Sequence, residues 1–448
     1  MSSMQLLPYK QQVSSLLRLG LPIVVGQLGM IILGLADTIM IGHHSTEELA
    51  AAAFVNNVFN LAIIFATGFS YGLTPLIGML QGGGNTQGIG RVFRNALAAN
   101  ASVAVLLTAV MYTVYCFVDK LGQPEELLPH IRPYFVLQLI SLLFIMLFNG
   151  FRQFAEGLTD TRTPILLCGN ALNIFGNYLL IYGSFGFPEW GLFGAGVSTL
   201  VSRIVMLLVF IGVVAVARRY KVYREAILRS RFNRNDFIQL NALGWPIALQ
   251  MGMETAAFSL SAIMVGWLGS IPLAAHQIMI SVSTIGFMVY YGMGAALAVR
   301  VSHFMGQKDF PNLRRAVNSG MGIILSLAIV ASLFFYLVRT PIIYSFTEDH
   351  EVMIVVSSLI FSLIVYQFGD ALQITFANAL RGTTDVKPMM WIAFFSYFIV
   401  ALPVGYLCGF TWGGGVVGVW VAFPAGLFTA GFLFWLRFRY RLQQLMKK

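Results

Sequence analysis

One apolar stretch near the amino terminus decides the fold: Leu19-Gly-Leu-Pro-Ile-Val-Val-Gly-Gln-Leu-Gly-Met-Ile-Ile-Leu-Gly-Leu-Ala-Asp-Thr-Ile-Met-Ile-Gly42. It is long enough to cross a bilayer, whose hydrocarbon core of about 30 Å needs about 20 apolar residues. It also carries one carboxylate, Asp37. An ionised group inside a membrane is costly, so it indicates a functional site that faces the interior of a helix bundle.

The composition of the whole chain agrees with this stretch. Of its 448 residues, 58% are hydrophobic and 10% are charged, whereas about a quarter of the residues of a soluble protein are charged. The chain is therefore predicted to be a polytopic membrane protein. Twelve segments are apolar and long enough to span: 15–41, 49–80, 94–117, 133–155, 162–183, 191–217, 237–267, 273–302, 315–338, 351–380, 388–409 and 416–436.

The basic residues give the orientation. Twelve spans place both termini on one side, and the segments assigned to that side hold 24 of the 28 Lys and Arg residues, Arg381 among them, against three on the other side. By the positive-inside rule, both termini are predicted to be cytoplasmic in a multi-pass protein of the inner (plasma) membrane. The net charge of +10 is thus an orientation signal, with the lipid bilayer as partner and no nucleic acid. No cleaved signal peptide is expected in the mixed polar segment 1–17.

An internal repeat organises the chain. At an offset of 224 residues, Leu19-Gly-Leu-Pro22 recurs as Leu243-Gly-Trp-Pro246, and Ile39-Met-Ile-Gly42 recurs as Ile263-Met-Val-Gly266. Each repeat holds six spans, an even number, so both run in the same sense, as in transporters built from parallel repeats. The predicted fold is an all-α membrane protein with twelve transmembrane helices in two parallel six-helix repeats and a central cleft.

The repeat also predicts the domains. We expect an amino-terminal six-helix lobe at 1–217, a cytoplasmic basic linker at 218–236, a carboxyl-terminal six-helix lobe at 237–436 and a cytoplasmic tail at 437–448.

Three of the 18 acidic residues lie inside spans, namely Asp37, Glu254 and Asp370. The spanning basic residue in this assignment is Arg203, which could neutralise Asp37 but has no counterpart in the carboxyl-terminal lobe. With two carboxylates and no resident cation there, a mobile Na⁺ or H⁺ is the expected counter-charge. Carboxylate oxygens suit Na⁺ and a desolvated carboxyl group suits H⁺, so the choice stays open.

Two asparagines accompany Asp37. Asn173 and Asn177 are four residues apart and share a helix face, and Asn177 has a depth similar to that of Asp37. They could support a site at Asp37, or they could form hydrogen bonds between helices.

Several motifs in order resemble the multidrug and toxic compound extrusion (MATE) family. They are Asp37-Thr-Ile-Met-Ile-Gly42 at the end of the first span, Leu273-Ala-Ala-His-Gln277 at the start of the eighth and Leu380-Arg-Gly382 at the end of the tenth. The pairing of Gln250-Met-Gly-Met-Glu-Thr255 with Tyr366-Gln-Phe-Gly-Asp-Ala-Leu-Gln373 resembles the NorM branch.

The resemblance implies that Glu254 and Asp370 bind the coupling cation, which could be Na⁺, with Gln373 in support. It implies a second cation or substrate site at Asp37. From their positions, we expect Asn173, Asn177 and Arg203 to decide whether Asp37 binds substrate, binds a cation or is only neutralised. The related DinF branch has an additional Asp on the fifth helix, and Asn177 takes that place here, which weakens a DinF-like mechanism.

The predicted function is secondary antiport. Organic, drug-like and often cationic compounds would leave in exchange for Na⁺ or H⁺, and no cofactor is expected. Two alternatives remain, a lipid-linked precursor flippase of the same wider superfamily and a major-facilitator exporter. An enzyme is not expected, because the sequence holds no metal cluster and no nucleophile with a base near a membrane surface.

Overall fold

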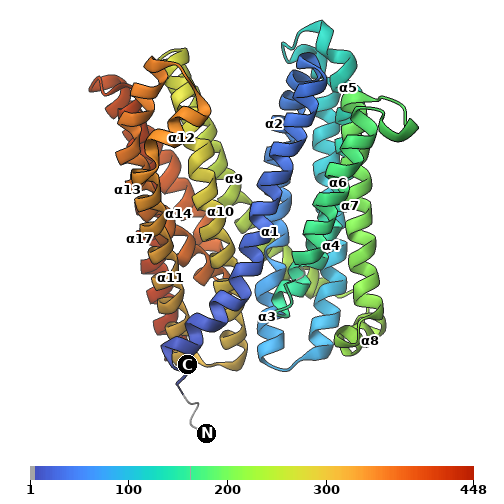
Figure 1. Ribbon diagram of the computed structural model, residues 1–448. Coiled ribbons are helices and arrows are strands. Elements are labelled where there is room, and N and C mark those ends of the chain that lie inside the picture. The colour runs from blue at the N-terminus through green and yellow to red at the C-terminus, as the bar shows by residue number, and fades with distance from the viewer. Residues whose placement is uncertain (1–5, 162, 448) are drawn as a thin grey trace. The chain divides into compact units, whose positions relative to one another are not determined.

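The computed structural model describes residues 6–161 and 163–447, and every regular element in this part of the chain is helical (Figure 1). Twelve helical stretches are long and apolar enough to cross a membrane. This confirms the predicted all-α membrane fold and its twelve spans. Several of these stretches extend past the predicted apolar segments by a turn or more at one end, as α1 (Tyr9–His44) does before residue 15, whereas the fifth, Pro164–Ile181, is slightly shorter than the predicted 162–183.

The first repeat continues from α1 through seven more α-helices. These are α2 (Thr46–Ser70), α3 (Leu73–Gly82), α4 (Thr86–Cys116), α5 (Leu128–Gly157), α6 (Thr163–Ile181), α7 (Gly191–Val216) and α8 (Lys221–Arg229). Short 3₁₀ turns lie between some of them: η1 (Val118–Lys120), η2 (Glu125–Leu127), η3 (Ser184–Gly186) and η4 (Arg218–Tyr220).

The second repeat begins with α9 (Arg234–Gly266). It continues with α10 (Ser270–Gln307), α11 (Phe310–Leu337), α12 (Arg339–Phe346), α13 (His350–Gly382), α14 (Lys387–Phe394), α15 (Leu402–Tyr406), α16 (Gly415–Trp420) and α17 (Ala422–Met446). Two π-helical segments, η5 (Phe395–Ala401) and η6 (Leu407–Thr411), interrupt the eleventh span.

The helices form two compact units. The amino-terminal unit is Val25–Ala248, and the carboxyl-terminal unit is Met1–Val24 with Leu249–Lys448. The two boundaries fall inside α1 and α9, at positions that the 224-residue offset makes equivalent. The predicted lobe limits at residues 217 and 237 differ from these boundaries, because α1 and α9 each contribute to both units.

A proline lies two residues before each boundary. Pro22 is inside α1 and Pro246 is inside α9. Each removes one backbone N–H from the helical hydrogen-bond ladder. The repeat therefore places a weakened turn at the same point of both helices.

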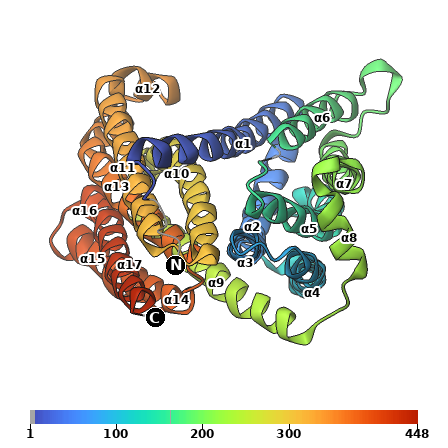
Figure 2. The ribbon, with the colours of Figure 1, turned by 90° about the horizontal axis from the view of Figure 1, so that it is seen from below.

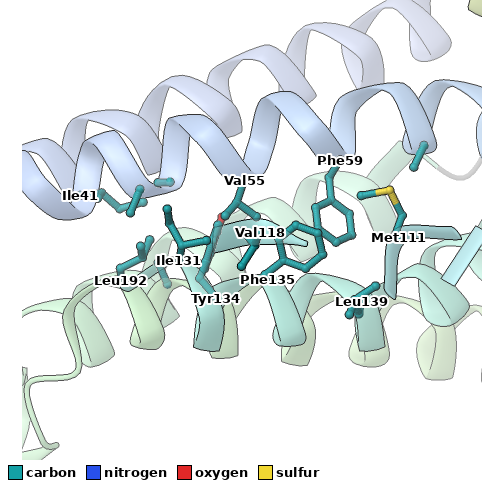
Figure 3. Packing of buried hydrophobic residues seen from close by; sticks show 14 of the residues in the cluster. Ile41, Val55, Phe59, Met111, Val118, Ile131, Tyr134, Phe135, Leu139 and Leu192 are labelled. Atoms are coloured by element: carbon teal, nitrogen blue, oxygen red, sulfur yellow. The ribbon is translucent and has the colours of Figure 1, made fainter. Parts of the chain in front are cut away.

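Each unit has its own packed helices (Figure 2). In the amino-terminal unit, α3, α4 and α5 pack against one another, and α5 also packs on α7. In the carboxyl-terminal unit, α13 packs on α10, α11 and α17. The amino-terminal unit holds an apolar cluster in which α2 meets α5, where Phe59 and Phe135 meet edge to face at 4.7 Å between ring centroids (Figure 3).

Candidate functional site

In the carboxyl-terminal unit, two amide side chains donate hydrogen bonds to Glu254. Gln250, one turn earlier on α9, donates from Nε2 to Oε2 of Glu254 at 3.0 Å. Gln373 of α13 donates from Nε2 to the same oxygen at 2.9 Å. Hydrogen bonds to an ionised acceptor are stronger than neutral ones, so this carboxylate joins α9 to α13.

The same unit contains a buried arginine close to Glu254. Arg381 is 5% exposed, and its Nη2 donates to Oε1 of Gln250 at 2.7 Å. It interacts electrostatically with Glu254. The expectation of no resident cation in this half is therefore wrong: Arg381, counted with a cytoplasmic loop, is inside α13. The Gln250 amide nevertheless lies between the guanidinium and the carboxylate.

Asp370 has no such partner. Its side chain is completely buried, and neither carboxylate oxygen accepts a hydrogen bond from the described residues. The charged group that interacts with it is another acid, Glu254. Burying an unpaired ionised carboxylate in a low-dielectric interior costs roughly several kcal/mol of folding free energy. Asp370 therefore requires a bound cation or a proton.

Two glutamines flank Asp370 on α13, three residues away on each side. Gln367 accepts a hydrogen bond at Oε1 from the Tyr290 hydroxyl at 2.8 Å, and its buried Nε2 has no partner among the described residues. Oε1 of Gln373 is also buried without a partner. Together with Asp370, this helix offers three unpartnered acceptor oxygens. Hard cations prefer oxygen ligands, so the chemistry of these oxygens suits Na⁺, and Asp370 could equally bind a proton.

Aromatic rings pack beside the two carboxylates. Phe258, one turn after Glu254 on α9, stacks on Phe423 of α17 with 4.7 Å between ring centroids. Tyr366, one turn before Asp370, meets the Phe258 ring edge to face at 6.3 Å. These rings make the surroundings of the carboxylates apolar, which strengthens any electrostatic interaction there.

In the amino-terminal unit, Asp37 is bound by the predicted asparagines. Asn177 donates from Nδ2 to Oδ1 of Asp37 at 2.6 Å. The Asn173 amide satisfies its neighbours when its nitrogen faces Asp37, to which it then donates at 2.9 Å, and its oxygen accepts from the Thr199 backbone N–H at 3.2 Å. Oδ1 of Asn177 is buried without a partner among the described residues. This arrangement leaves oxygen acceptors at Asp37 for a cation.

Arg203 does not form an ion pair with Asp37. Its Nη1 donates to Oε1 of Gln138 at 3.1 Å and to the Ser141 hydroxyl. No carboxylate oxygen of the described chain lies within 4.0 Å of its nitrogens. Arg203 and Asp37 do interact electrostatically. Direct neutralisation of Asp37, one of the roles left open for Arg203, is therefore absent from this geometry.

Sequence reasoning missed several residues that contact or interact with the predicted ones, among them Gln250, Arg381, Thr199, Gln138 and Ser141. Gln250 had a usable signal, because it lies four residues before Glu254 on one helix face. Arg381 lies one residue from the end of a span, so a one-residue error moves it between loop and membrane. Nothing local marks Thr199 or Gln138, since their partners lie on other helices.

Among the described residues, no group of three or more His, Cys, Asp and Glu side chains is arranged to hold a metal ion.

A model of the family described as MatE matches residues 22–179 and 246–407. The chain belongs to the MatE family. The two matches begin 224 residues apart, the offset of the sequence repeat. Membership rules out the alternative of a major-facilitator exporter and confirms a transporter rather than an enzyme.

Relatives of this MatE-family protein match over almost its whole length. The multidrug resistance protein NorM of Photobacterium profundum is 29% identical over 448 residues, 96% of each chain. The outward-facing structure of a multidrug resistance MATE family transporter of the MOP superfamily has a TM-score of 0.89 at 20% identity, covering 98% of this chain and 97% of that one. A mutant of the Vibrio cholerae MATE transporter VcmN has a TM-score of 0.88 at 18% identity, covering 98% and 99%. The fold is therefore that of MATE transporters.

Proposed function

We propose that this protein is a secondary antiporter that exports organic, often cationic compounds in exchange for Na⁺ or H⁺. Its place would be the inner (plasma) membrane, with both termini in the cytoplasm, as the distribution of basic residues predicts. The relative from Photobacterium profundum is called a multidrug resistance protein, which supports drug-like substrates.

The observation that carries the proposal is the environment of Asp370. Asp370 is completely buried, and both of its oxygens lack a partner in the described chain. Glu254, in contrast, is held by two amide groups. A buried carboxylate without a partner is unstable unless a cation or proton binds, so occupancy of this site responds to ion concentration.

Antiport follows from electrostatics. In a low-dielectric site, Glu254 and Asp370 are stabilised by a positive charge, and a second positive charge nearby is repelled. Entry of the coupling ion would therefore weaken the binding of a cationic substrate. If the ion and the substrate favour different conformations, each shifts the population toward its own state, and the two fluxes are coupled in opposite directions.

The amino-terminal unit would supply a second site. Asp37 offers its carboxylate oxygens there, and the neighbouring Asn177 has an amide oxygen without a partner in the described chain, while Asn173 and Thr199 hold the arrangement. We assign to it a second cation or the cationic group of the substrate.

Flux measurements in proteoliposomes test the proposal. A cationic dye is loaded, and efflux is followed under an imposed Na⁺ gradient and, separately, an imposed H⁺ gradient. We expect one of the two gradients to drive export and the Glu254→Gln and Asp370→Asn variants to lose it. Glu47→Gln, on the exposed first turn of α2, is the matched control and keeps it.

Two outcomes contradict the proposal. If dye is exported but neither the Na⁺ gradient nor the H⁺ gradient drives the export, the protein is not an antiporter for these ions and the flippase alternative is favoured. Wild-type efflux by both site variants removes Glu254 and Asp370 from the coupling mechanism.

A further inference from the structure

Arg203 is a charged side chain in the middle of a membrane-spanning helix. It lies on α7, about 18 Å from the outer end at Gly191 by helical rise. It follows Thr199 by four residues and so shares its helix face, and Thr199 contacts Asn173 beside Asp37. Exposed apolar side chains such as Val201 and Leu208 lie on a different face of α7. Arg203 thus belongs to the polar side of the helix.

The hydrogen-bond partners that Arg203 has within the described residues are neutral. Gln138 and Ser141, which accept from its Nη1, are 5% and 1% exposed. Asp37 is likewise held by neutral amides. Arg203 and Asp37 therefore interact electrostatically within the amino-terminal unit, but each has its own neutral hydrogen-bond partners and no ion pair joins them. Each charge retains its attraction for a charged group of opposite sign.

The Arg203 guanidinium has unused hydrogen-bond donors on the edge that can bind a carboxylate. Both N–H groups of Nη1 are used by Gln138 and Ser141, which leaves Nε and Nη2. Neither nitrogen has a hydrogen-bond partner in the described chain. Neither is among the described side-chain atoms that are both fully buried and without a partner. These two nitrogens form the edge of arginine that binds a carboxylate with two parallel hydrogen bonds.

A chain of hydrogen bonds leads from Arg203 to an exposed polar side chain. Gln138 donates from Nε2 to the Tyr134 hydroxyl at 3.0 Å, and that hydroxyl donates to Asn56 Oδ1 at 3.1 Å. The Tyr134 ring is packed in the apolar cluster (Figure 3). Asn56 is exposed on α2, about 15 Å from the outer end of that helix. An exposed amide at this depth is favourable where it lines a water-filled path.

We propose that Arg203 is the subsite for an anionic group of the transported substrate. Substrates with a carboxylate or sulfonate and a cationic nitrogen would then be bound at both ends, the anion by Arg203 and the cation by Asp37. The inference rests on the proposed export function and adds a preference for zwitterions over simple cations. Arg203 acts by direct contact with the substrate, whereas Gln138 and Ser141 hold its side chain in place.

Binding of a matched pair of dyes tests this subsite. The purified full-length protein is titrated with a zwitterionic rhodamine that carries a free carboxylate and with the methyl ester of the same dye, which is only cationic. We expect the wild type to bind the zwitterion more tightly. The Arg203→Gln variant should lose at least about tenfold in affinity for the zwitterion and change less than about threefold for the ester. Arg203→Lys keeps the charge but lacks the two-nitrogen edge, so its loss should be intermediate.

Two controls make the result specific. Arg132→Gln removes an exposed arginine of the same unit, paired with Asp119, and should leave both affinities unchanged. Binding of the ester reports that Arg203→Gln is folded. If Arg203→Gln does not fold, Arg203→Lys is tested in its place. The proposal is then overturned if Arg203→Lys binds each of the two dyes with the same affinity as the wild type does.

Three results contradict the subsite: an equal loss for both dyes in Arg203→Gln, a wild type that prefers the ester, and a wild type that binds neither. The binding assay needs no ion gradient. Loss of gradient-driven efflux with an intact dye preference therefore counts against antiport alone, and intact efflux without a dye preference counts against the subsite alone.

Discussion

Arg381 donates a hydrogen bond to Oε1 of Gln250 at 2.7 Å, and this contact orients the Gln250 amide so that its nitrogen faces Glu254. The guanidinium therefore acts on the carboxylate through one neutral side chain. A direct Arg–Glu ion pair would compete with a coupling cation, whereas the intervening amide keeps the carboxylate oriented and available.

Replacing Gln250 by Leu tests this arrangement. The variant leaves Glu254 with one amide donor and removes an acceptor from buried Arg381, which costs about 1 to 3 kcal/mol of folding free energy. We expect a lower melting temperature and a coupling-ion affinity reduced by about tenfold, both measured on purified protein. Gln277→Leu, at an exposed position of α10, should change neither quantity. An unchanged ion dependence in Gln250→Leu would show that the amide is dispensable.

The stability of the wild type should depend on the coupling ion through Asp370. An ion that binds only the folded state adds about 2.7 kcal/mol when its concentration is 100 times its dissociation constant. We expect the melting temperature to rise as Na⁺ is added or, for proton coupling, as pH falls. In Asp370→Asn the buried side chain no longer needs a counter-charge. The melting temperature of this variant should therefore change less with Na⁺ concentration or pH than that of the wild type. Equal slopes for wild type and variant would place the ion elsewhere.

Packing of α8 against α4 depends on Gly90. A Cβ at Gly90 would lie 2.6 Å from the backbone nitrogen of Ile227, so Gly90→Ala must displace the helix. We expect a loss of about 1 to 3 kcal/mol, seen as a lower melting temperature. At Gly212 on α7 a Cβ meets nothing within 4 Å, and Gly212→Ala should be neutral or stabilising because Ala favours helix. The same melting temperature in both variants would contradict this packing.

Two ion pairs should differ in their effect on stability. Arg152 and Glu156 are joined at 2.8 Å with side chains 9% and 7% exposed, whereas Arg132 and Asp119 are paired with side chains 45% and 47% exposed. Glu156→Gln removes the charge of one member of this buried pair and should cost about 3 kcal/mol. Asp119→Asn should cost less than about 1 kcal/mol. Chemical denaturation in detergent measures both, and the reverse order would be inconsistent with these burial values.

The membrane-spanning pattern was predictable because it is local. A run of about 20 apolar residues is sufficient to identify a span, and a carboxylate inside such a run is visible directly. The pairing of Asn177 with Asp37 was also within reach, since both depths follow from helical rise. The depth argument did not identify Thr199, because a hydroxyl side chain is common in spans.

The side-chain partners depended on tertiary contacts. Glu254 receives its second amide from Gln373, 119 residues later in the chain. Arg381 was predicted to be outside the membrane, and its burial depends on how far α13 extends and which helix covers its end. No property of residues near Glu254 in sequence specifies either contact.

The sequence by itself determined twelve helices, their repeat with an offset of 224 residues and the three carboxylates that they carry. Helix formation and membrane insertion depend on composition over about 20 neighbouring residues, so they are encoded locally. Only the tertiary structure decided that Asp370 has no hydrogen-bond partner among the described residues, that Glu254 is reached by two amides and that Arg203 forms no ion pair with Asp37. These outcomes depend on the rotation and packing of helices distant in sequence, which determine the side chains that come within hydrogen-bonding distance.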